Sequence, residues 1–375
     1  MMKIAVNTRL LRKGKMDGIG WFTFNALLNI TQKNQDVEFH CFFDSGIEKD
    51  FVFGPNIIPH KLFPPAKHSA LNIVWSEFSV RNKLKKIKPD IYFSPDGMLC
   101  LGWDGPQYGV IHDINFMHHP EFLKFSNRIY YRHYFPKFAH KATRLATVSE
   151  YSKKDIVNTF KIDSRKIDVV YCGINSFFQE VDESTIVKTR LEFSGGKPYF
   201  LFVGTLSPRK NVVGLIKAYE AFRRESSNAI KLLIAGGGMY KSDEVTAIKK
   251  QSEFGEDIIM TGRVDNDALN NLYASAHALV FVPFFEGFGI PLVEAMQCKI
   301  PIIASGITSL PEIAGNAALI VDPYDETEIK NAMILISSDN NLRNELISKG
   351  QEQKKLFSWE RTADLLWEGI NKCLY

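Results

Sequence analysis

The sequence predicts an α/β protein made of two domains, each built around a parallel sheet. Short apolar runs recur along the 375 residues, and many are followed by a glycine or polar loop and then by a helical pattern. A chain of this length exceeds the usual size of one domain. Its composition, 45% hydrophobic and 23% charged, is typical of a globular protein with a large core. We place the domain boundary near Asn175, between residues 1–175 and 176–357.

The first half alternates strand and helix patterns. The expected strands are Lys3–Asn7, Val37–Phe43, Pro89–Pro95, Gln107–Ile111, Arg144–Val148 and Lys166–Gly173. Helical spacing covers Phe22–Ile30, Leu71–Ile87 and Tyr130–Lys141. The proline-containing segment Phe51–Pro65 is expected to be an irregular connection. Ser149, or Ser152 with Asp155, is expected to cap the helix that follows residue 148.

The second half repeats the pattern from residue 199 onward. Its expected strands are Tyr199–Val203, Lys231–Ala235, Ile258–Val264, Ala278–Pro283 and Pro301–Ser305. Helices are expected over Val212–Arg224, over Asp267–Ser275 with Asp267 as its cap, and after Ser358 at the end of the chain.

The composition argues against a membrane-spanning, a secreted or a zinc-stabilised protein. No apolar stretch reaches the 18 or more residues that span a bilayer, and the opening Met1–Asn7 is typical of a strand, not of a signal peptide. We therefore expect a cytoplasmic protein. The five cysteines lack CxxC pairs and histidine partners, which argues against disulfides and structural zinc and favours buried thiols.

Charge is distributed unevenly along the chain. The net charge of +4 combines +9 over residues 1–175 with −5 over residues 176–375. Basic clusters lie at Lys83–Lys88 and along 128–144, and solvated helix faces are their commoner explanation. The alternative is contact with a membrane surface or with a diphosphate-linked lipid acceptor. No nucleic-acid-binding motif accompanies the charge, so nucleic acid is not expected as a partner.

A glycine loop with two glutamates follows the apolar run Ala278–Pro283. The string 284–296 reads FFEGFGIPLVEAM, so the predicted order is strand, loop and helix, with Pro291 in the first helical turn. Glycines let the backbone approach a ligand, and a helix start offers unpaired N–H groups to an anion. Glu286 and Glu294 are suited to accept hydrogen bonds from sugar hydroxyls. A capped helix with an N-terminal glutamate would explain one Glu, but not the whole string.

A second glycine loop, Gly204–Asn211, follows the strand Tyr199–Val203. It carries Arg209 and Lys210 just before a helix start. An arginine fork, a lysine point charge and unpaired amides are what binding a diphosphate requires.

Two features of the first half are weaker signals. His112 and Asp113 follow the strand Gln107–Ile111, at the sheet edge where open α/β sheets bind ligands. Asp113 could orient the loop, bind an acceptor or set the tautomer of His112. Gly18 and Gly20 precede a helix and form an anion cradle or a plain flexible turn.

These motifs together resemble the E-x7-E signature and flanking segments of retaining, nucleotide-sugar-dependent glycosyltransferases of family 4. The resemblance covers nearly the whole chain and is strongest from Phe200 to Pro323. It implies the GT-B fold, in which two Rossmann-like domains face each other across a cleft and the last helix, within 358–375, crosses back to the first domain. Members with Gly-Thr-Leu-x-Pro-Arg-Lys-Asn, as at Gly204–Asn211, often include mannosyltransferases of polysaccharide assembly.

The resemblance also implies roles for individual residues. Glu286 and His112 would hold the donor sugar, Glu294 the ribose, and Arg209 and Lys210 the diphosphate, with amides near Phe288 and Gly289. Further donor-side residues would be Gly18, Gly20, Gly204, Arg263 and Val264, and Asp113 is an acceptor-side candidate. Many family members carry an arginine where this chain has Thr205, so Arg209 would provide that charge.

No cofactor or metal is expected. Asp265-Asn266-Asp267 matches the Asp-x-Asp metal motif of another glycosyltransferase fold, but Asp267 fits a helix cap and the GT-B arrangement uses cations and helix dipoles instead. The implied reaction moves a hexose, expected to be mannose from GDP-mannose, to a hydroxyl of a glycan or lipid-linked acceptor. A GT-B-like nucleotide-sugar epimerase and a non-catalytic nucleotide-binding protein are the alternatives.

Overall fold

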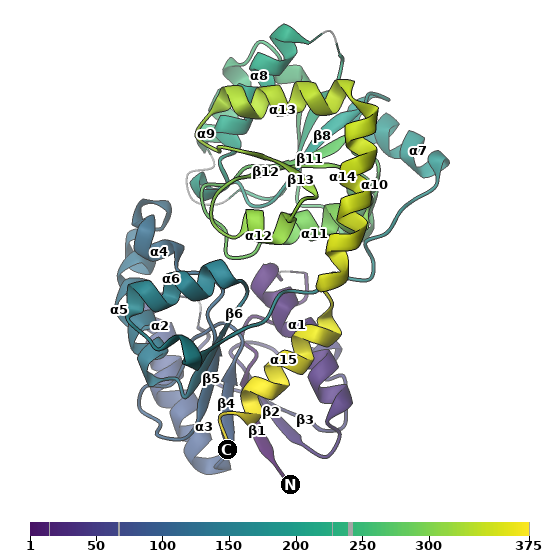
Figure 1. The fold of residues 1–375 in the computed structure, drawn as a ribbon. Helices are drawn as coiled ribbons and strands as arrows, with labels where there is room; N and C mark the ends of the chain where they lie inside the picture. The colour runs from purple at the N-terminus through teal and green to yellow at the C-terminus, as the bar shows by residue number, and fades with distance from the viewer. Residues whose placement is uncertain (15, 67, 227, 239–242, 375) are drawn as a thin grey trace. The chain divides into compact units, whose positions relative to one another are not determined.

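The computed structural model describes residues 1–14, 16–66, 68–226, 228–238 and 243–374. The chain divides into two compact units: unit 1 comprises Met1–Gly173 with Ser358–Tyr375, and unit 2 comprises Ile174–Phe357 (Figure 1). Each unit is a parallel sheet flanked by helices, as the sequence predicts. All five tryptophans belong to unit 1, namely Trp21, Trp75, Trp103, Trp359 and Trp367.

Unit 1 has a seven-stranded sheet of order β3-β2-β1-β4-β5-β6-β7, in which every pairing is parallel. Its strands are β1 (Lys3–Asn7), β2 (Glu38–Phe43), β3 (Ile57–Lys61), β4 (Ile91–Ser94), β5 (Gln107–Val110), β6 (Arg144–Thr147) and β7 (Ile167–Val169). Its α-helices are α1 (Gly18–Lys33), α2 (Ser69–Val74), α3 (Arg81–Ile87), α4 (Asn115–His118), α5 (Phe125–Lys141), α6 (Glu150–Phe160) and α15 (Trp359–Asn371). A π-helical segment, Trp75–Val80, joins α2 to α3, and 3₁₀ turns lie at Lys49–Phe51, Pro120–Phe122 and Ser164–Lys166.

The segment expected to be irregular, Phe51–Pro65, contains the strand β3. Ile57 to Lys61 pair in parallel with Phe39 to Phe43 of β2. The expectation was wrong because a proline such as Pro59 usually argues against a strand. Strand β3, however, lies at the edge of the sheet, where the missing N–H of a proline costs no hydrogen bond to a neighbouring strand.

Two helix starts differ from the sequence analysis, and at a third the structure decides between the two predicted caps. Helix α1 begins at Gly18, not at Phe22, because Asp17 Oδ1 accepts a hydrogen bond from the amide of Gly20 at 3.0 Å. Ser149, not Ser152, caps α6. Asp265, not Asp267, caps the helix that begins at Asn266. In each case the cap is the polar residue that lies directly before the first helical turn.

Unit 2 has a six-stranded parallel sheet of order β10-β9-β8-β11-β12-β13. Its strands are β8 (Tyr199–Val203), β9 (Lys231–Ala235), β10 (Ile258–Gly262), β11 (Ala278–Phe281), β12 (Ile302–Ser305) and β13 (Ala318–Val321). Its α-helices are α7 (Glu183–Ser194), α8 (Val212–Glu225), α9 (Asp243–Gln251), α10 (Asn266–Ala274), α11 (Ile290–Gln297), α12 (Leu310–Ala314), α13 (Glu326–Ser338) and α14 (Asn340–Gln353). Its 3₁₀ turns are Pro208–Lys210, Gly255–Asp257 and Lys354–Leu356.

The helix α15 belongs to unit 1 although it ends the chain. It packs beside α1 (Figure 1), where the ring of Trp359 meets that of Phe22 edge-on with centroids 5.9 Å apart. The hydroxyl of Thr362 donates to the carbonyl of Tyr171 at 2.6 Å. The last helix therefore crosses back to the first unit, as the resemblance implies.

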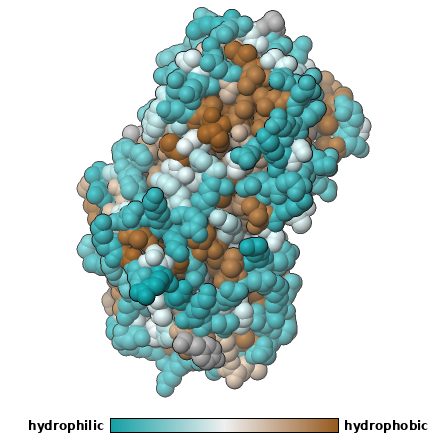
Figure 2. Space-filling view, viewed as in Figure 1, coloured by the Kyte–Doolittle hydropathy of each residue, from teal (hydrophilic) through white to brown (hydrophobic). Residues whose placement is uncertain are grey.

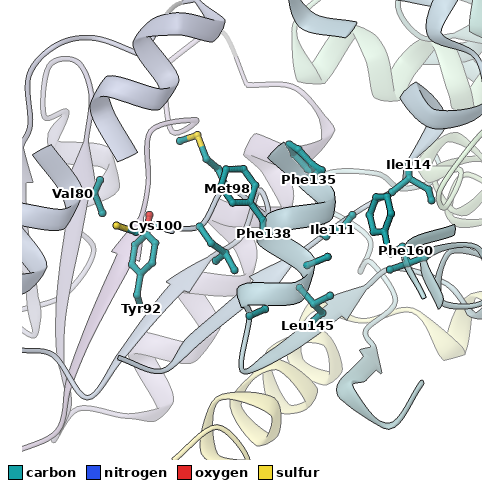
Figure 3. Packing of buried hydrophobic residues seen from close by; sticks show 14 of the residues in the cluster. Val80, Tyr92, Met98, Cys100, Ile111, Ile114, Phe135, Phe138, Leu145 and Phe160 are labelled. Atoms are coloured by element: carbon teal, nitrogen blue, oxygen red, sulfur yellow. The ribbon is translucent and has the colours of Figure 1, made fainter. Parts of the chain in front are cut away.

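Buried apolar side chains fill the space between the sheet of unit 1 and its helices. Figure 3 shows part of this cluster, to which Tyr92 of β4, Phe138 of α5 and Leu145 of β6 belong. The five cysteines are buried and unbonded, as expected. On the face drawn in Figure 2, hydrophilic side chains cover most of each unit and apolar ones form separate patches. No helix in the described ranges is long and apolar enough to cross a bilayer.

Candidate functional site

The sheet of unit 2 has one point where the chain leaves neighbouring strands in opposite directions. Strand β8 leads through α8 to β9, whereas its neighbour β11 leads through α11 to β12 on the other side. In open α/β sheets ligands bind outside the carboxyl ends of such a strand pair. The loop that follows β8 carries Arg209 and Lys210, and the loop that follows β11 carries Glu286.

Glu286 lies between the two cations at this strand pair. Its Oε1 atom is 2.8 Å from Arg209 Nη1 and 2.5 Å from Lys210 Nζ. Arg209 Nη1 also donates to the carbonyl of Phe285 at 2.8 Å, and Lys210 Nζ lies 4.7 Å from the centroid of the Phe281 ring. The structure thus brings together three residues that the sequence analysis selected from two separate motifs.

Burial and neighbouring charges act in opposite directions on the pKa of Glu286, a residue that is 8% exposed. Burial by itself would raise the pKa of the carboxyl, but the charges of Arg209 and Lys210 outweigh it and hold the pKa below its ordinary value. Glu286 is therefore ionised near neutral pH. A charged group held this firmly in a buried place is a common property of binding and catalytic sites.

Two neighbouring hydroxyl side chains hold the backbone of Glu286 in place. Ser309 Oγ donates to the carbonyl of Glu286 at 3.0 Å, and the amide of Glu286 donates to Thr308 Oγ1 at 3.3 Å. Thr308 has φ +61°, which is unfavourable for a β-branched residue. Such strain persists only where the surroundings hold it, and it often marks a functional loop.

Asn211 and Gly289 complete the loop framework of this site. Asn211 adopts φ +54° before α8 and donates to the carbonyls of Val282 at 3.0 Å and Pro323 at 2.8 Å, which ties the two loops together. Gly289 has φ +99°, which strains any residue with a side chain, and a Cβ atom there would lie 2.3 Å from Leu310 Cδ2, so the leucine would also have to shift.

Glu294 lies on α11, which has Pro291 in its first turn as predicted. Its Oε2 atom accepts a hydrogen bond from the Tyr273 hydroxyl at 2.6 Å. Burial raises the pKa of Glu294 to about 7, and the opposing effects of Tyr273 and of the Lys210 charge do not cancel this. Close to neutral pH, Glu294 therefore changes between a neutral acid and a carboxylate.

This raised pKa predicts that stability depends on pH through Glu294. Between pH 4.5, the ordinary pKa, and about 7, the folded state keeps a proton that the unfolded chain has lost, so the free energy of unfolding falls as pH rises. The total loss is on the order of 3 kcal/mol. Glu294→Gln should remove this slope, measured by urea unfolding followed by circular dichroism at pH 5 and pH 8. The exposed Glu244→Gln is the control, and an unchanged slope in Glu294→Gln would contradict the prediction.

The other predicted donor-side residues lie in unit 2 around the same sheet edge. Gly204 follows β8 with φ +151°, and a Cβ atom there would come within 3.6 Å of Lys210 Cε. Arg263 and Val264 follow β10, where Arg263 is exposed. Phe288 is buried, and its ring meets that of Phe357 edge-on at 5.6 Å. Their roles stay predictions.

The predicted residues of unit 1 gather at the carboxyl edge of its own sheet. His112 follows β5, and its ring meets the Phe22 ring of α1 edge-on at 4.8 Å. Its Nε2 atom donates to the carbonyl of Pro95 at 2.8 Å. Burial lowers the pKa of His112, so the ring is neutral at pH 7 and its Nδ1 atom can accept a hydrogen bond.

Asp113 and the glycines Gly18 and Gly20 have local structural partners. Asp113 Oδ1 accepts from the amide of Asn115 at 3.0 Å, which orders the start of α4. Gly18 and Gly20 lie in the first turn of α1, where the side chain of Asp17 accepts a hydrogen bond from the amide of Gly20. Because that amide is used within the chain, fewer N–H groups remain for an anion here than at a bare helix start.

Sequence reasoning missed four residues that shape these sheet edges: Tyr273, Thr308, Arg9 and Asp96. Tyr273 is the hydrogen-bond partner of Glu294 and lies in a helix pattern that gave no functional signal. Arg9 Nε lies 2.7 Å from Asp96 Oδ2. That pair follows two strands far apart in the sequence, so only the strand order shows that they meet. Within the described residues, no group of three or more His, Cys, Asp or Glu side chains could hold a metal ion.

Family models match both halves of the chain. The model described as glycosyl transferases group 1 matches residues 184–353, and that for glycosyltransferase family 4 matches residues 16–176. The chain is 30% identical over 255 residues to the O-antigen chain mannosyltransferase B of Escherichia coli, which covers 67% of this chain and 66% of that protein. It is also 30% identical over 226 residues to the O-antigen chain mannosyltransferase RfbU of Salmonella typhimurium, covering 60% and 59%. The chain thus spans about two thirds or less of the length of these relatives, and 29% of the mannosyltransferase WbdA of Escherichia coli.

Solved structures show the same fold. Sucrose-phosphate synthase from Thermosynechococcus elongatus superposes with a TM-score of 0.81 at 17% identity over 99% of each chain. The Anabaena protein HepE in complex with UDP-glucose superposes with a TM-score of 0.77 at 16% identity over 99% of this chain and 100% of that one. The fold is therefore GT-B, and the chain belongs to the glycosyltransferases of group 1 and family 4, with relatives among the O-antigen mannosyltransferases.

Proposed function

We propose that this chain is a retaining glycosyltransferase that moves a hexose from a nucleoside diphosphate sugar to a hydroxyl of a glycan or lipid-linked acceptor in cell-surface polysaccharide assembly. Mannose from GDP-mannose is the preferred donor in this proposal, because several relatives of the chain are named mannosyltransferases. A nucleotide-sugar donor is also in keeping with the Anabaena neighbour, which was solved with UDP-glucose.

The observation that carries the proposal is the group of partly buried Arg209, buried Lys210 and buried Glu286 at the carboxyl ends of β8 and β11. A departing diphosphate needs two cations that are already in place, and here both are held by one carboxylate. When a diphosphate draws on these cations, Glu286 becomes available to accept hydrogen bonds from sugar hydroxyls. Glu294, with Tyr273 beside it, would accept from the ribose hydroxyls.

The reaction would need no metal or cofactor in this proposal. Arg209 and Lys210 would stabilise the negative charge that develops on the leaving diphosphate. We infer a front-face displacement, in which a donor phosphate oxygen takes the proton of the acceptor hydroxyl while the new glycosidic bond forms on the face that the nucleotide leaves. Trapping a glycosylated side chain would contradict this mechanism.

Calorimetric titration with GDP and with UDP tests the donor site. We expect one of the two nucleotides to bind clearly, which also selects the donor sugars for assay. Incubating that donor sugar without an acceptor then separates the classes of enzyme, because an epimerase would convert the sugar of the donor while a transferase would not. Binding of neither nucleotide would contradict the donor-site assignment and the proposed function.

Contact with an anionic membrane surface through the basic unit 1 is part of the same proposal. A lipid-linked acceptor would be presented at such a surface, and basic residues there gain about 1 kcal/mol each near anionic lipid. Co-sedimentation with anionic and with neutral vesicles measures this, and we expect more protein on the anionic ones at low salt.

A further inference from the structure

Unit 1 repeats the strand arrangement that positions the candidate donor site of unit 2. Strand β1 leads through α1 to β2, whereas its neighbour β4 leads on to β5 on the other side of the sheet. An arginine follows the first strand and a carboxylate follows its neighbour in both units. Arg9 and Asp96 in unit 1 therefore have the positions that Arg209 and Glu286 have in unit 2.

Asp96 is held firmly and aims one oxygen at Arg9. Its Oδ1 atom accepts from Asn7 Nδ2 at 2.8 Å, from Ser94 Oγ at 2.9 Å and from the amide of Met98 at 3.0 Å. Its Oδ2 atom lies 2.7 Å from Arg9 Nε, and the side chain of Asp96 is 5% exposed. Arg9 Nε and Asp96 Oδ2 are both buried, and the attraction between opposite charges holds this end of the guanidinium beside the carboxylate.

The outer end of Arg9 remains available. In the part of the chain that the structure describes, no residue accepts a hydrogen bond from its Nη atoms, and its side chain is 14% exposed. The hydroxyl of Tyr130, a residue only 4% exposed, also lacks a described hydrogen-bond partner. Arg9 and Asp96 are among the charged groups that act on this hydroxyl. Buried polar groups normally have hydrogen-bond partners. A hydroxyl without one, near a guanidinium whose Nη atoms can still donate, indicates a place for the polar atoms of another molecule.

The charges around Arg9 favour a neutral ligand over a phosphate. Arg9 is balanced by Asp96, and the next cation, Arg12, is balanced by Asp44 at 2.7 Å. Asp17 and Asp113 add two more carboxylates that act on the neighbouring His112. Carboxylates therefore outnumber cations at this edge, so an anion would be repelled while hydroxyl groups could still accept from the Arg9 Nη atoms.

We propose that Arg9, positioned by Asp96, binds the hydroxyl groups of an uncharged sugar unit at the carboxyl ends of β1 and β4, and that this sugar belongs to the acceptor. The inference deepens the proposed function. It rests on that function in one respect, namely that the bound sugar is assigned to the acceptor. Arg9 is the binding residue, and Asp96 is a positioning residue. A guanidinium fork makes two parallel hydrogen bonds, which suits neighbouring hydroxyls of a sugar ring.

Saturation-transfer NMR with simple glycosides tests the site directly. The probes are methyl α-D-mannopyranoside and methyl α-D-glucopyranoside at high millimolar concentration, with inorganic pyrophosphate as the anionic competitor. We expect the wild-type protein to give signals from at least one glycoside, and pyrophosphate to leave them unchanged. Absence of any glycoside signal, or displacement by pyrophosphate, would overturn the proposal.

Variants then assign the binding to Arg9. Arg9→Gln should abolish the glycoside signal and Arg9→Lys should recover only part of it, because lysine keeps the charge without the fork. Both variants should fold, since Asp96 retains three donors. Tryptophan fluorescence during unfolding reports this, because every tryptophan is in unit 1. Arg165→Gln, at an exposed ion pair of the same unit, is the matched control. A full signal in folded Arg9→Gln would refute the assignment.

Calorimetry with GDP and UDP separates failure of this inference from failure of the proposed function. If wild-type protein binds a nucleotide and Arg9→Gln retains both that affinity and the glycoside signal, the inference on Arg9 is wrong and the proposed function stands. If the glycoside signal depends on Arg9 but neither nucleotide binds, the sugar site stands and the proposed function fails.

With an assayed acceptor, Arg9→Gln and Asp96→Asn should raise the KM for acceptor at least about tenfold. The KM for donor should stay within about twofold.

Discussion

Lys210→Met is expected to lower turnover by about 100-fold or more and to weaken nucleotide binding by at least tenfold. Lys210 Nζ is the cation nearest to Glu286, and in the proposed function it stabilises the leaving diphosphate. Methionine keeps much of the length and apolar contact of the side chain, including that with the Phe281 ring, but removes the charge. The measurements are steady-state rates with the donor selected above and calorimetry with its nucleotide.

A second variant separates the catalytic effect of Lys210 from its effect on stability. Removing Lys210 leaves the buried Glu286 with Arg209 alone, which should destabilise unit 2. Glu286→Gln added to Lys210→Met should recover stability without recovering nucleotide binding. Lys217→Met, which breaks the exposed pair with Glu326, is the control for removing a lysine from unit 2. Normal nucleotide affinity in Lys210→Met would refute the donor-site assignment.

Gly236→Ala is expected to lower the free energy of unfolding of unit 2 by about 3 kcal/mol or more. Gly236 has φ +153°, and a Cβ atom there would lie 1.8 Å from the carbonyl oxygen of Gly204. The obstacle is backbone of the loop that follows β8, so it cannot move away as a side chain would. The same loop carries Arg209 and Lys210, so nucleotide binding should be lost together with stability.

Gly237→Ala is a closely matched control for Gly236→Ala. It changes the adjacent residue by the same methyl group, but a Cβ atom at Gly237 meets no atom of the described residues within 4 Å. Circular dichroism follows both units, whereas tryptophan fluorescence follows unit 1 alone. We expect Gly236→Ala to shift the transition seen by circular dichroism and to leave the fluorescence transition in place. Equal stability of the two variants would contradict the close approach of Gly236 to Gly204.

Most helices and strands could be predicted from local sequence patterns, whereas the pairing of the strands could not. The strands β1, β8 and β9 begin and end at the predicted residues, because their apolar runs are bounded by polar or glycine residues. Strand β3 was missed because the tolerance of Pro59 depends on its place at the sheet edge, which a single sequence does not reveal. The start of α1 was missed because Gly18 and Gly20 suggest a loop, whereas the cap at Asp17 decides the boundary.

The candidate sites show the same difference between local and long-range information. Arg209, Lys210 and Glu286 could be selected from sequence because each lies in a motif with its own glycine and helix start. Their convergence on one carboxylate oxygen depends on the adjacency of β8 and β11. Arg9 and Asp96 lie in no motif, and their contact became visible only when β1 and β4 were found side by side.

The return of α15 to unit 1 affects the order in which the protein can be completed during synthesis. A ribosome makes residues 174–357 before it makes Ser358–Tyr375, so unit 1 lacks one of its helices throughout the synthesis of unit 2. Until then the Phe22 ring of α1 and the carbonyl of Tyr171 lack their partners Trp359 and Thr362. A stop codon after residue 357 would therefore harm the part of the protein that was made first.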